Sequence, residues 1–352
     1  MASTGQAGAG PDTVPGVAVA PGTRTARRVR RSRATLVGSY LLTVAFLVTL
    51  NFLLPRVMPG DPLAAQQATG SPAYVYDDEA RDALADYYGL DEPLLAQYRD
   101  YLGGFVQGDL GRSITLNRPA TDLVLERLPW TALLVGTSLA MAALVGVLAG
   151  ISAGWRRGRR VDRATLGLFL SAYNVPSFFL ASVVLLVFSV QLDWFPLAGA
   201  RTPFTDMGAF DRAGDVLHHL ALPAAVLAVQ PAASYYLVMR AGMVSELGTD
   251  HLLLGRAKGL RDRRLEYRYA ARNAILPVVT LSALQLRLAV TGTVFVETVF
   301  AYPGIGRLLF DAVRSRDYPV LQACFLLLTL LTVTANLGAD LVNRRLDPRT
   351  AA

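Results

Sequence analysis

The sequence predicts an all-α integral membrane protein with six transmembrane helices and both termini on the cytoplasmic side. Three observations carry this prediction: an apolar composition, long apolar runs, and an uneven distribution of arginine. Hydrophobic residues make up 53% of the 352 residues and charged residues 17%, whereas about a quarter of the residues of a soluble domain are charged. A soluble helical bundle would also not require its apolar residues to come in long runs.

Each apolar run is near or above the ~20 residues that a helix needs to cross the bilayer core. Only the fifth run contains an Asp, Glu, Lys or Arg residue, which is Arg287. The six predicted spans are Leu36–Leu54, Thr131–Ala153, Ala164–Val190, Leu220–Val238, Ile275–Val296 and Val320–Ala339.

Arginine is concentrated in the segments that we assign to the cytoplasmic side. These are the N-terminus, the loop Trp155–Arg163, the loop Arg240–Arg272 and the C-terminus, which together hold 22 of the 34 Lys and Arg residues but 8 of the 27 acidic residues. Because short cytoplasmic loops are enriched in positive charge, both termini are predicted to lie inside. The net charge of +7 then reflects membrane orientation, and the arginines are too dispersed to predict a nucleic-acid partner.

The predicted organisation has five parts. Residues 1–33 are rich in Ala, Gly, Pro, Thr and Arg without apolar periodicity, which predicts a disordered cytoplasmic tail. Residues 34–54 form the first transmembrane helix, interpreted as an uncleaved anchor because no small-residue cleavage site follows it. An extracytoplasmic loop spans residues 55–119, the main membrane domain residues 120–342, and a cytoplasmic C-terminal tail residues 343–352.

The predicted extracytoplasmic loop is the largest segment outside the membrane. Near its start, Pro59-Gly-Asp-Pro62 is a turn-forming cluster that should stop the first helix. Farther along, Asp77–Tyr88 predicts an amphipathic acidic helix. The loop is too short for an independent binding domain, so we expect it to pack over the outer membrane face or to cap a vestibule.

The residues needed for most chemistry are missing from the sequence, which predicts a protein that is not an enzyme and has no metal or cofactor. The one cysteine, Cys324, excludes an internal disulfide, and the three histidines show no zinc-site spacing. The one lysine, Lys258, does not belong to a phosphate-binding loop. Energy for uphill work would therefore come from another subunit or from an ion gradient.

The basic loop between the fourth and fifth spans predicts a docking surface. Gly248 and Gly259 are natural helix-end residues, with Gly259 closing a turn before Leu260. Positive charge toward a partner or toward lipid headgroups comes from Arg261, Arg263, Arg264, Arg268 and Arg272. On spacing alone, an ordinary loop obeying the positive-inside rule explains these residues equally well.

Six ordered motifs resemble one known family, the first membrane subunit of binding-protein-dependent ABC importers for dipeptides, oligopeptides and nickel. The resemblance covers nearly everything from residue 35 to residue 349. The motifs are Met58-Pro-Gly-Asp-Pro62, Gly255-Arg-Ala-Lys-Gly-Leu260, Arg272-Asn-Ala-Ile-Leu-Pro277, Val296-Glu-Thr-Val-Phe-Ala-Tyr-Pro-Gly-Ile-Gly306, Arg316-Asp-Tyr-Pro319 and Leu346-Asp-Pro348.

The resemblance implies a permease in the bacterial cytoplasmic membrane with the type I ABC importer transmembrane fold, residues 120–342 being its type-1 transmembrane domain. It also implies a second, homologous permease subunit, two cytoplasmic ATPase subunits that hydrolyse ATP, and an extracytoplasmic solute-binding protein. The Arg240–Pro277 loop, hereafter the coupling loop, would seat its short helices in a groove of the ATPase. Its motif residues are Gly255, Arg256, Ala257, Lys258, Gly259 and Leu260.

The coupling loop departs from the family pattern just before this motif. Where the family usually has a Tyr, an Arg and a Thr, this chain has His251, Leu253 and Leu254. These changes make the docking helix more apolar, which suggests a matched ATPase.

Arg287 and Glu297 are candidates for the translocation path or its gate. Arg287 lies ten residues past Pro277, which at ~1.5 Å per residue puts it near the membrane midplane. A charge at that depth is costly unless it faces a cavity or a partner, so it lines the pathway, pairs with an acid of the partner permease, or binds helix carbonyls. Glu297 resembles a family glutamate and is interpreted either as part of an outer gate or as a solvated interfacial carboxylate.

Turn and proline signals indicate where the membrane helices deviate from straight rods. Asn174-Val-Pro176 in the third span, with Pro223 and Pro231 in the fourth, predict kinks. The glycines of Tyr302-Pro-Gly-Ile-Gly306 are expected to permit a positive φ and let the chain fold back.

The main alternative function is an ion-coupled secondary transporter. That class would show buried acid pairs or an inverted repeat, and the predicted spans contain neither. The substrate stays open among dipeptides, oligopeptides, nickel and other solutes.

Overall fold

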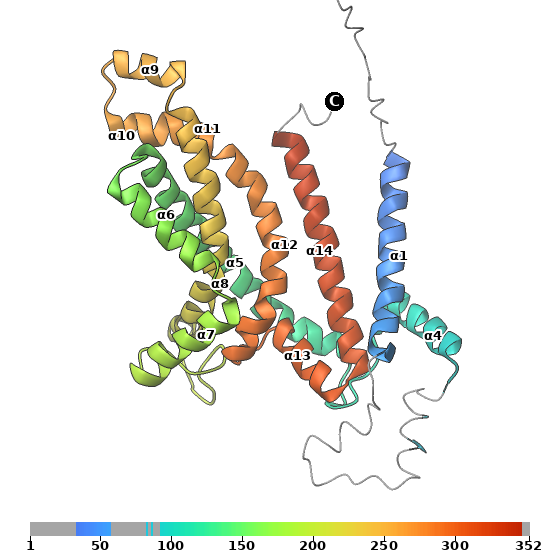
Figure 1. Ribbon diagram of the computed structural model, residues 1–352. Coiled ribbons are helices and arrows are strands. Elements are labelled where there is room, and N and C mark those ends of the chain that lie inside the picture. The colour runs from blue at the N-terminus through green and yellow to red at the C-terminus, as the bar shows by residue number, and fades with distance from the viewer. Residues whose placement is uncertain (1–32, 58–81, 84–85, 87–91, 347–352) are drawn as a thin grey trace, which may run out of the picture. The chain divides into compact units, whose positions relative to one another are not determined.

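The computed structural model describes residues 33–57, 82–83, 86 and 92–346 (Figure 1). A compact unit of residues 46–352 contains every described helix except the first part of α1, which belongs to a separate unit of residues 1–45. Among the described residues the regular structure is helical, apart from one isolated β-bridge between Arg112 and Pro119. The helices are α1 (Arg33–Val57), α4 (Leu94–Gln107), α5 (Ala120–Trp155), α6 (Arg160–Tyr173), α7 (Ser177–Leu185), the π-helix η1 (Leu186–Gln191), α8 (Ala209–Glu246), α9 (Asp250–Ala257), α10 (Asp262–Arg264), the π-helix η2 (Leu265–Ala270), α11 (Ala271–Ala274), α12 (Leu276–Val299), α13 (Ile305–Ser315) and α14 (Tyr318–Leu346).

Five of the six predicted spans each fall on one described helix, and the third falls on α6, α7 and η1. These helices differ in how far they meet the length and apolarity needed to cross a membrane. Among the described residues, α5 with 36 residues and α8 with 38 residues meet both requirements. The pair of α6 with α7 and η1 meets them only when taken together. Shorter apolar stretches lie in the remaining three helices: Leu42–Val57 in α1, Leu276–Leu286 in α12 and Tyr318–Thr334 in α14.

Helices α5 and α8 pack closely along a stripe of glycines on α5. Gly146, Gly150 and Gly154 recur every four residues and therefore share one face of the helix. A Cβ on Gly150 would lie 2.8 Å from the Cβ of Met239 and 2.9 Å from the carbonyl oxygen of Tyr236. Small residues at this spacing let two membrane helices approach backbone to backbone.

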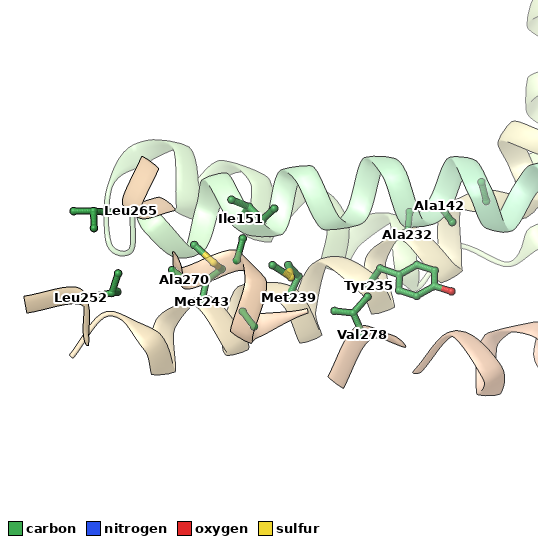
Figure 2. Close-up of a cluster of buried hydrophobic side chains, with 13 residues drawn as sticks. Ala142, Ile151, Ala232, Tyr235, Met239, Met243, Leu252, Leu265, Ala270 and Val278 are labelled. Carbon is green, nitrogen blue, oxygen red and sulfur yellow. The ribbon is translucent and has the colours of Figure 1, made fainter. Parts of the chain in front are cut away.

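A buried apolar cluster continues this contact toward the coupling loop. Figure 2 shows Ile151 of α5 beside Met239 and Met243 of α8, with Leu252 and Leu265 at the end of the cluster. The last two residues belong to α9 and η2, so the coupling loop shares its core with the α5–α8 pair.

The third span is broken, where the sequence predicted one kinked helix. Helices α6 and α7 are bent by 99° across the break at residues 174–176. Pro176 precedes the first residue of α7, and its missing N–H and fixed φ suit that position. Pro223 and Pro231, by contrast, lie inside the continuous helix α8.

The described part of the predicted extracytoplasmic loop packs on the second half of α1 and on α14. The described part of α1 extends to Val57, and the Pro59-Gly-Asp-Pro62 cluster that was predicted to stop this helix lies outside the described residues. The amide of Asn51 donates hydrogen bonds to the hydroxyl of Tyr101 at 3.1 Å and to the carbonyl of Gln322 at 2.8 Å. Helix α4, which was not predicted, therefore lies beside α1, whereas the predicted helix Asp77–Tyr88 lies largely outside the described residues.

Helix α13 returns between the start of α5 and the start of α14. Its buried residues Ile305, Leu308 and Ala312 form a cluster with Leu123 of α5 and Leu321 of α14. The Arg316-Asp-Tyr-Pro319 motif then starts α14, with the Asp317 carboxylate accepting hydrogen bonds from the Ser113 hydroxyl and, at 3.1 Å, from the Thr115 backbone N–H. The chain after α12 is thus tied both to α5 and to the segment preceding it.

Candidate functional site

The coupling-loop motif Gly255–Leu260 is the end of helix α9. The N–H of Leu260 donates to the carbonyl of Gly255 at 3.2 Å, and the N–H of Gly259 donates to the carbonyl of Arg256 at 2.9 Å. Gly259 has φ +70°, the left-handed conformation that glycine adopts without strain. This is the Schellman pattern of helix termination, so the motif fixes where α9 stops, and the predicted turn at Gly259 is confirmed.

Gly255 serves packing, whereas its neighbours remain accessible. A Cβ on Gly255 would lie 2.6 Å from a methyl of Leu265, so a larger residue here would displace the Leu265 side chain. Arg256 is exposed and lies above the ring of Trp155, 5.8 Å from its centroid. Ala257 and Lys258 are exposed as well, and Leu260 is half-buried against the apolar cluster.

Helix α9 has one anchored and one free apolar side. Leu252 is fully buried, whereas Leu253 is 52% exposed and Leu254 is 56% exposed. The exposed pair therefore coincides with two of the three departures from the family pattern. The third, His251, is held by Glu246, whose carboxylate lies 3.0 Å from the His251 Nε2.

The coupling loop also carries exposed positive charge. Five of its arginines are exposed: Arg261, Arg263, Arg264, Arg268 and Arg272. Whether they face a partner or lipid headgroups stays a prediction.

Two ion pairs bind the loop Trp155–Arg163 to the coupling loop, and sequence reasoning missed both. Asp162 is buried and accepts two hydrogen bonds from the Arg240 guanidinium, at 2.6 and 2.8 Å, and one from the backbone N–H of Gly158 at 2.9 Å. Arg240 holds the pKa of the Asp162 carboxyl below its usual range, against the opposing effect of burial. The sequence signal was one acid among five arginines in a short loop, which was used only for topology.

The second pair joins the same loop to η2. The Glu266 carboxylate is buried 3.6 Å from the Arg156 guanidinium. Burial raises the pKa of Glu266, and the nearby Arg156 opposes this effect.

Glu297 is the centre of a junction between α5, α12 and α13. Its side chain is 0% exposed. The Thr131 hydroxyl donates a hydrogen bond to one carboxylate oxygen at 2.8 Å, and the Arg307 backbone N–H donates to the other at 3.1 Å. Thr131 in turn accepts a hydrogen bond from the backbone N–H of Ile305 at 2.8 Å. The interpretation of Glu297 as a solvated interfacial carboxylate is therefore wrong.

The junction makes physical sense because Glu297 meets the N-terminus of α13. The first N–H groups of a helix lack partners within the helix and carry partial positive charge. Glu297 from α12 and Thr131 from α5 satisfy these groups from outside the helix. The sequence signal was the motif Val296–Gly306 itself, which contains both the carboxylate and the helix start that it binds.

The glycines in this turn serve close approach and not the positive φ that was predicted. Gly304 has φ −100° and ψ −178°, an extended conformation open to any residue. The positive φ in the turn is at Ala301, at 48°. A Cβ on Gly304 would instead clash with the Glu297 carboxylate, and one on Gly306 would lie 2.6 Å from the Cα of Val294.

Arg287 lies in the middle of α12, as its position in the fifth span predicted. Its side chain lies outside what the structure describes, and its role stays a prediction. Among the described residues, no group of three or more His, Cys, Asp or Glu side chains could hold a metal ion.

Comparisons with known proteins identify the family. Residues 146–352 match the family described as binding-protein-dependent transport system inner membrane component. The chain is 40% identical over 301 residues to a Brucella suis protein named as a peptide permease, covering 85% of this chain and 92% of that protein. It is 35% identical to the oligopeptide transport system permease protein AppB of Bacillus subtilis, with the same coverage.

A third relative is the glutathione transport system permease protein GsiC of Escherichia coli, 36% identical over 299 residues, which cover 85% of this chain and 92% of that protein. The match over more than half of the chain and the identities above one third agree with the all-helical, apolar structure. The chain therefore belongs to the family of binding-protein-dependent transport system inner membrane components and is a permease subunit of an ABC importer in the bacterial cytoplasmic membrane.

Proposed function

We propose that this permease forms half of the translocation pathway of a peptide importer, together with a second, homologous permease. It crosses the membrane six times with both termini in the cytoplasm, two ATPase subunits dock on its coupling loop, and a solute-binding protein delivers the substrate from outside. Peptides are the proposed substrate class because the relatives are named for peptides, oligopeptides and the peptide-like thiol glutathione.

The surface of α9 is the observation that carries the docking proposal. A helix stopped by a Schellman turn presents two exposed leucines, in a loop that also carries five exposed arginines, while Leu252 and Leu265 anchor it to the permease core. Exposed apolar residues surrounded by polar ones are typical of protein interaction sites. The ATPase would contribute an apolar groove with an acidic rim, and Leu253 and Leu254 would enter that groove.

The two ion pairs supply a route from the docked ATPase to the membrane helices. Asp162–Arg240 and Glu266–Arg156 make the two loops move as one body, so that a displacement of α9 would rotate α5, α6 and α8 together. The junction at Glu297 would play the corresponding part at the opposite end of α12, where it would hold α13 against α5 as an outer gate.

Arg287 is proposed to line the pathway and to meet an anionic group of the solute, such as a peptide carboxylate. Its depth in the fifth span supports this role, because an intramembrane charge is retained where it faces a cavity or a partner. If Arg287→Ala transports normally and Arg287→Glu lowers only expression, the pathway role is wrong.

The experiment that tests the assembly is a pull-down of the tagged chain from its native membrane in mild detergent, with the co-eluting subunits identified by mass spectrometry. We expect a second permease and one or two ATPases. Recovery of this chain alone or as a homo-oligomer, with the same result after crosslinking before extraction, would contradict the proposed assembly.

A further inference from the structure

A cavity of about 430 Å³ lies between α6, α7, α8 and α12, beside the break in the third span. Its volume falls within the range of small-molecule sites, which is about 300–1,000 Å³. The lining mixes apolar residues with five polar ones, although the surrounding helices are largely apolar. The polar lining residues are Tyr173, Ser177, Gln230, Ser234 and Gln285.

The polar lining of this cavity is explained by the break in the third span, where backbone groups outside a helix need hydrogen-bond partners. Helix α6 ends at Tyr173 and α7 begins at Ser177, so both ends of the break line the cavity. The Gln230 amide reaches across from α8 toward the carbonyl of Val175 inside the break, at 3.4 Å. Non-helical backbone at membrane depth is tolerated where it is buried in protein or lines a water-filled space, and here the polar lining indicates the second case.

The described lining offers a solute hydrogen-bonding groups and apolar surface. Among the described lining residues there is no Asp, Glu, Lys, Arg or His. Gln285 is buried, and each of its neighbours Leu288 and Phe295 offers an apolar surface. Amide side chains both donate and accept hydrogen bonds, which matches the alternating N–H and C=O groups of a peptide backbone.

We propose that this cavity is a transit site for the solute, in which Gln230 and Gln285 bind peptide-backbone amides while apolar side chains of the solute lie against Leu288 and Phe295. The inference rests on the proposed function and adds the contact residues and the recognition chemistry. Because Gln230 and Gln285 would bind the peptide backbone, this site would pass peptides of many sequences and would leave recognition of their charged groups to other residues.

The first test asks whether the cavity is open to water in the assembled transporter. Ser177→Cys and Ser234→Cys, each in a Cys324→Ser background, are treated in membranes with a membrane-impermeant maleimide, with and without ATP. Leu148→Cys, at an exposed apolar position of α5, is the matched control. We expect both cavity cysteines to react at least about 10-fold faster than the control in one nucleotide state. If neither reacts faster in any state, the inference is overturned.

The second test asks whether the amides contact the solute. Gln230→Leu and Gln285→Leu are compared with the conservative variant Gln285→Asn. The matched control is Gln322→Leu, because Gln322 is also buried but lies outside the cavity lining. Uptake of tritiated trialanine is measured in proteoliposomes that contain both permeases and the ATPases, with the binding protein outside. We expect each leucine variant in the cavity to lower uptake about 3- to 10-fold, the value of one hydrogen bond, and Gln285→Asn to retain most of it.

The outcomes separate this inference from the proposed function. Normal uptake by both cavity leucine variants, in complexes that assemble and hydrolyse ATP like the wild type, would overturn the transit site and leave the importer intact. Failure of the wild-type subunits to assemble would instead count against the proposed assembly. If the wild type does not transport trialanine, the maleimide comparison alone decides whether the transit site is supported or overturned.

Discussion

The Glu297 carboxylate occupies the space that a side chain on residue 304 would need. A glycine at residue 304 is therefore explained by this close contact, since its backbone conformation is open to any residue. Two residues of one motif, seven positions apart, thus form a matched pair. One supplies the anion, and the other lets the start of α13 come close enough to be bound by it.

Gly304→Ala should therefore destabilise the permease although alanine tolerates the local φ and ψ. Overpacking of a buried site costs about 1–3 kcal/mol, and here the new methyl also displaces Glu297 from Thr131. Thermal unfolding of the purified chain in detergent would measure the change. Gly214→Ala is the control, since nothing lies within 4 Å of its added Cβ. Equal melting temperatures for both variants would contradict the close approach.

Glu297→Gln tests the charge of the junction at almost constant shape. The amide oxygen can still accept one hydrogen bond, but its NH₂ group then faces a second donor, either the Thr131 hydroxyl or the Arg307 N–H. Leaving a buried donor unsatisfied costs about 1–3 kcal/mol. We expect lower stability and faster hydrogen exchange at the start of α13, with α9 unchanged. Protection at the start of α13 equal to the wild type would show that the carboxylate charge is dispensable there.

Gly150→Ala should weaken the α5–α8 contact by about 1–3 kcal/mol, because the new Cβ would overlap backbone and Cβ atoms of α8. The comparison is Gly136→Ala in the same helix, where the added Cβ meets nothing within 4 Å. That control should be neutral or slightly stabilising, since alanine is the better helix former by about 1 kcal/mol. Chemical denaturation in detergent measures both, and a neutral Gly150→Ala would refute the packing argument.

The pair Asp162–Arg240 should make stability depend on pH on the acid side. Because Arg240 lowers the pKa of Asp162 in the folded chain, the stabilisation is fully present above the ordinary carboxyl pKa of about 4 and is lost as the pH falls through the lowered value. We expect Asp162→Asn to cost about 1.5–3 kcal/mol at pH 7, with the difference from wild type vanishing in strong acid.

Glu126→Gln provides the control for this pH experiment, because Glu126 pairs with Arg118 in an exposed position. Its removal should leave the unfolding curve at pH 7 unchanged. A difference between wild type and Asp162→Asn that stays constant down to strong acid would contradict the assigned role of the ion pair.

Replacing Leu253 and Leu254 together by serine should weaken ATPase docking without unfolding the permease, since both side chains are exposed. Val161→Ser, an exposed apolar residue of the other loop, is the matched control. We expect the double variant to recover at most about one tenth of the ATPase subunits in a pull-down, while its melting temperature stays that of the wild type. Full recovery of the ATPases would place their docking elsewhere.

The sequence by itself determined the class of protein, the apolar segments on which the long described helices lie, and the family. It could do so because these features depend on local composition: an apolar run of sufficient length must be shielded from water, and a Gly-Leu pair after a helical segment is a local termination signal. The turn at Gly259 is an example that needs no knowledge of other parts of the chain.

Tertiary structure alone decided which distant groups meet. The sequence could not show that Glu297 binds Thr131, that Asp162 pairs with Arg240, or that Gly304 is needed for a carboxylate and not for a positive φ, because partners 166 or 78 residues apart leave no periodic signal. It predicted a kink at Asn174-Val-Pro176, whereas the structure has a 99° break there with a polar cavity beside it. Local sequence signals such as glycine and proline mark where a helix can end. Which distant residues then contact that end depends on how the helices pack together in the folded chain.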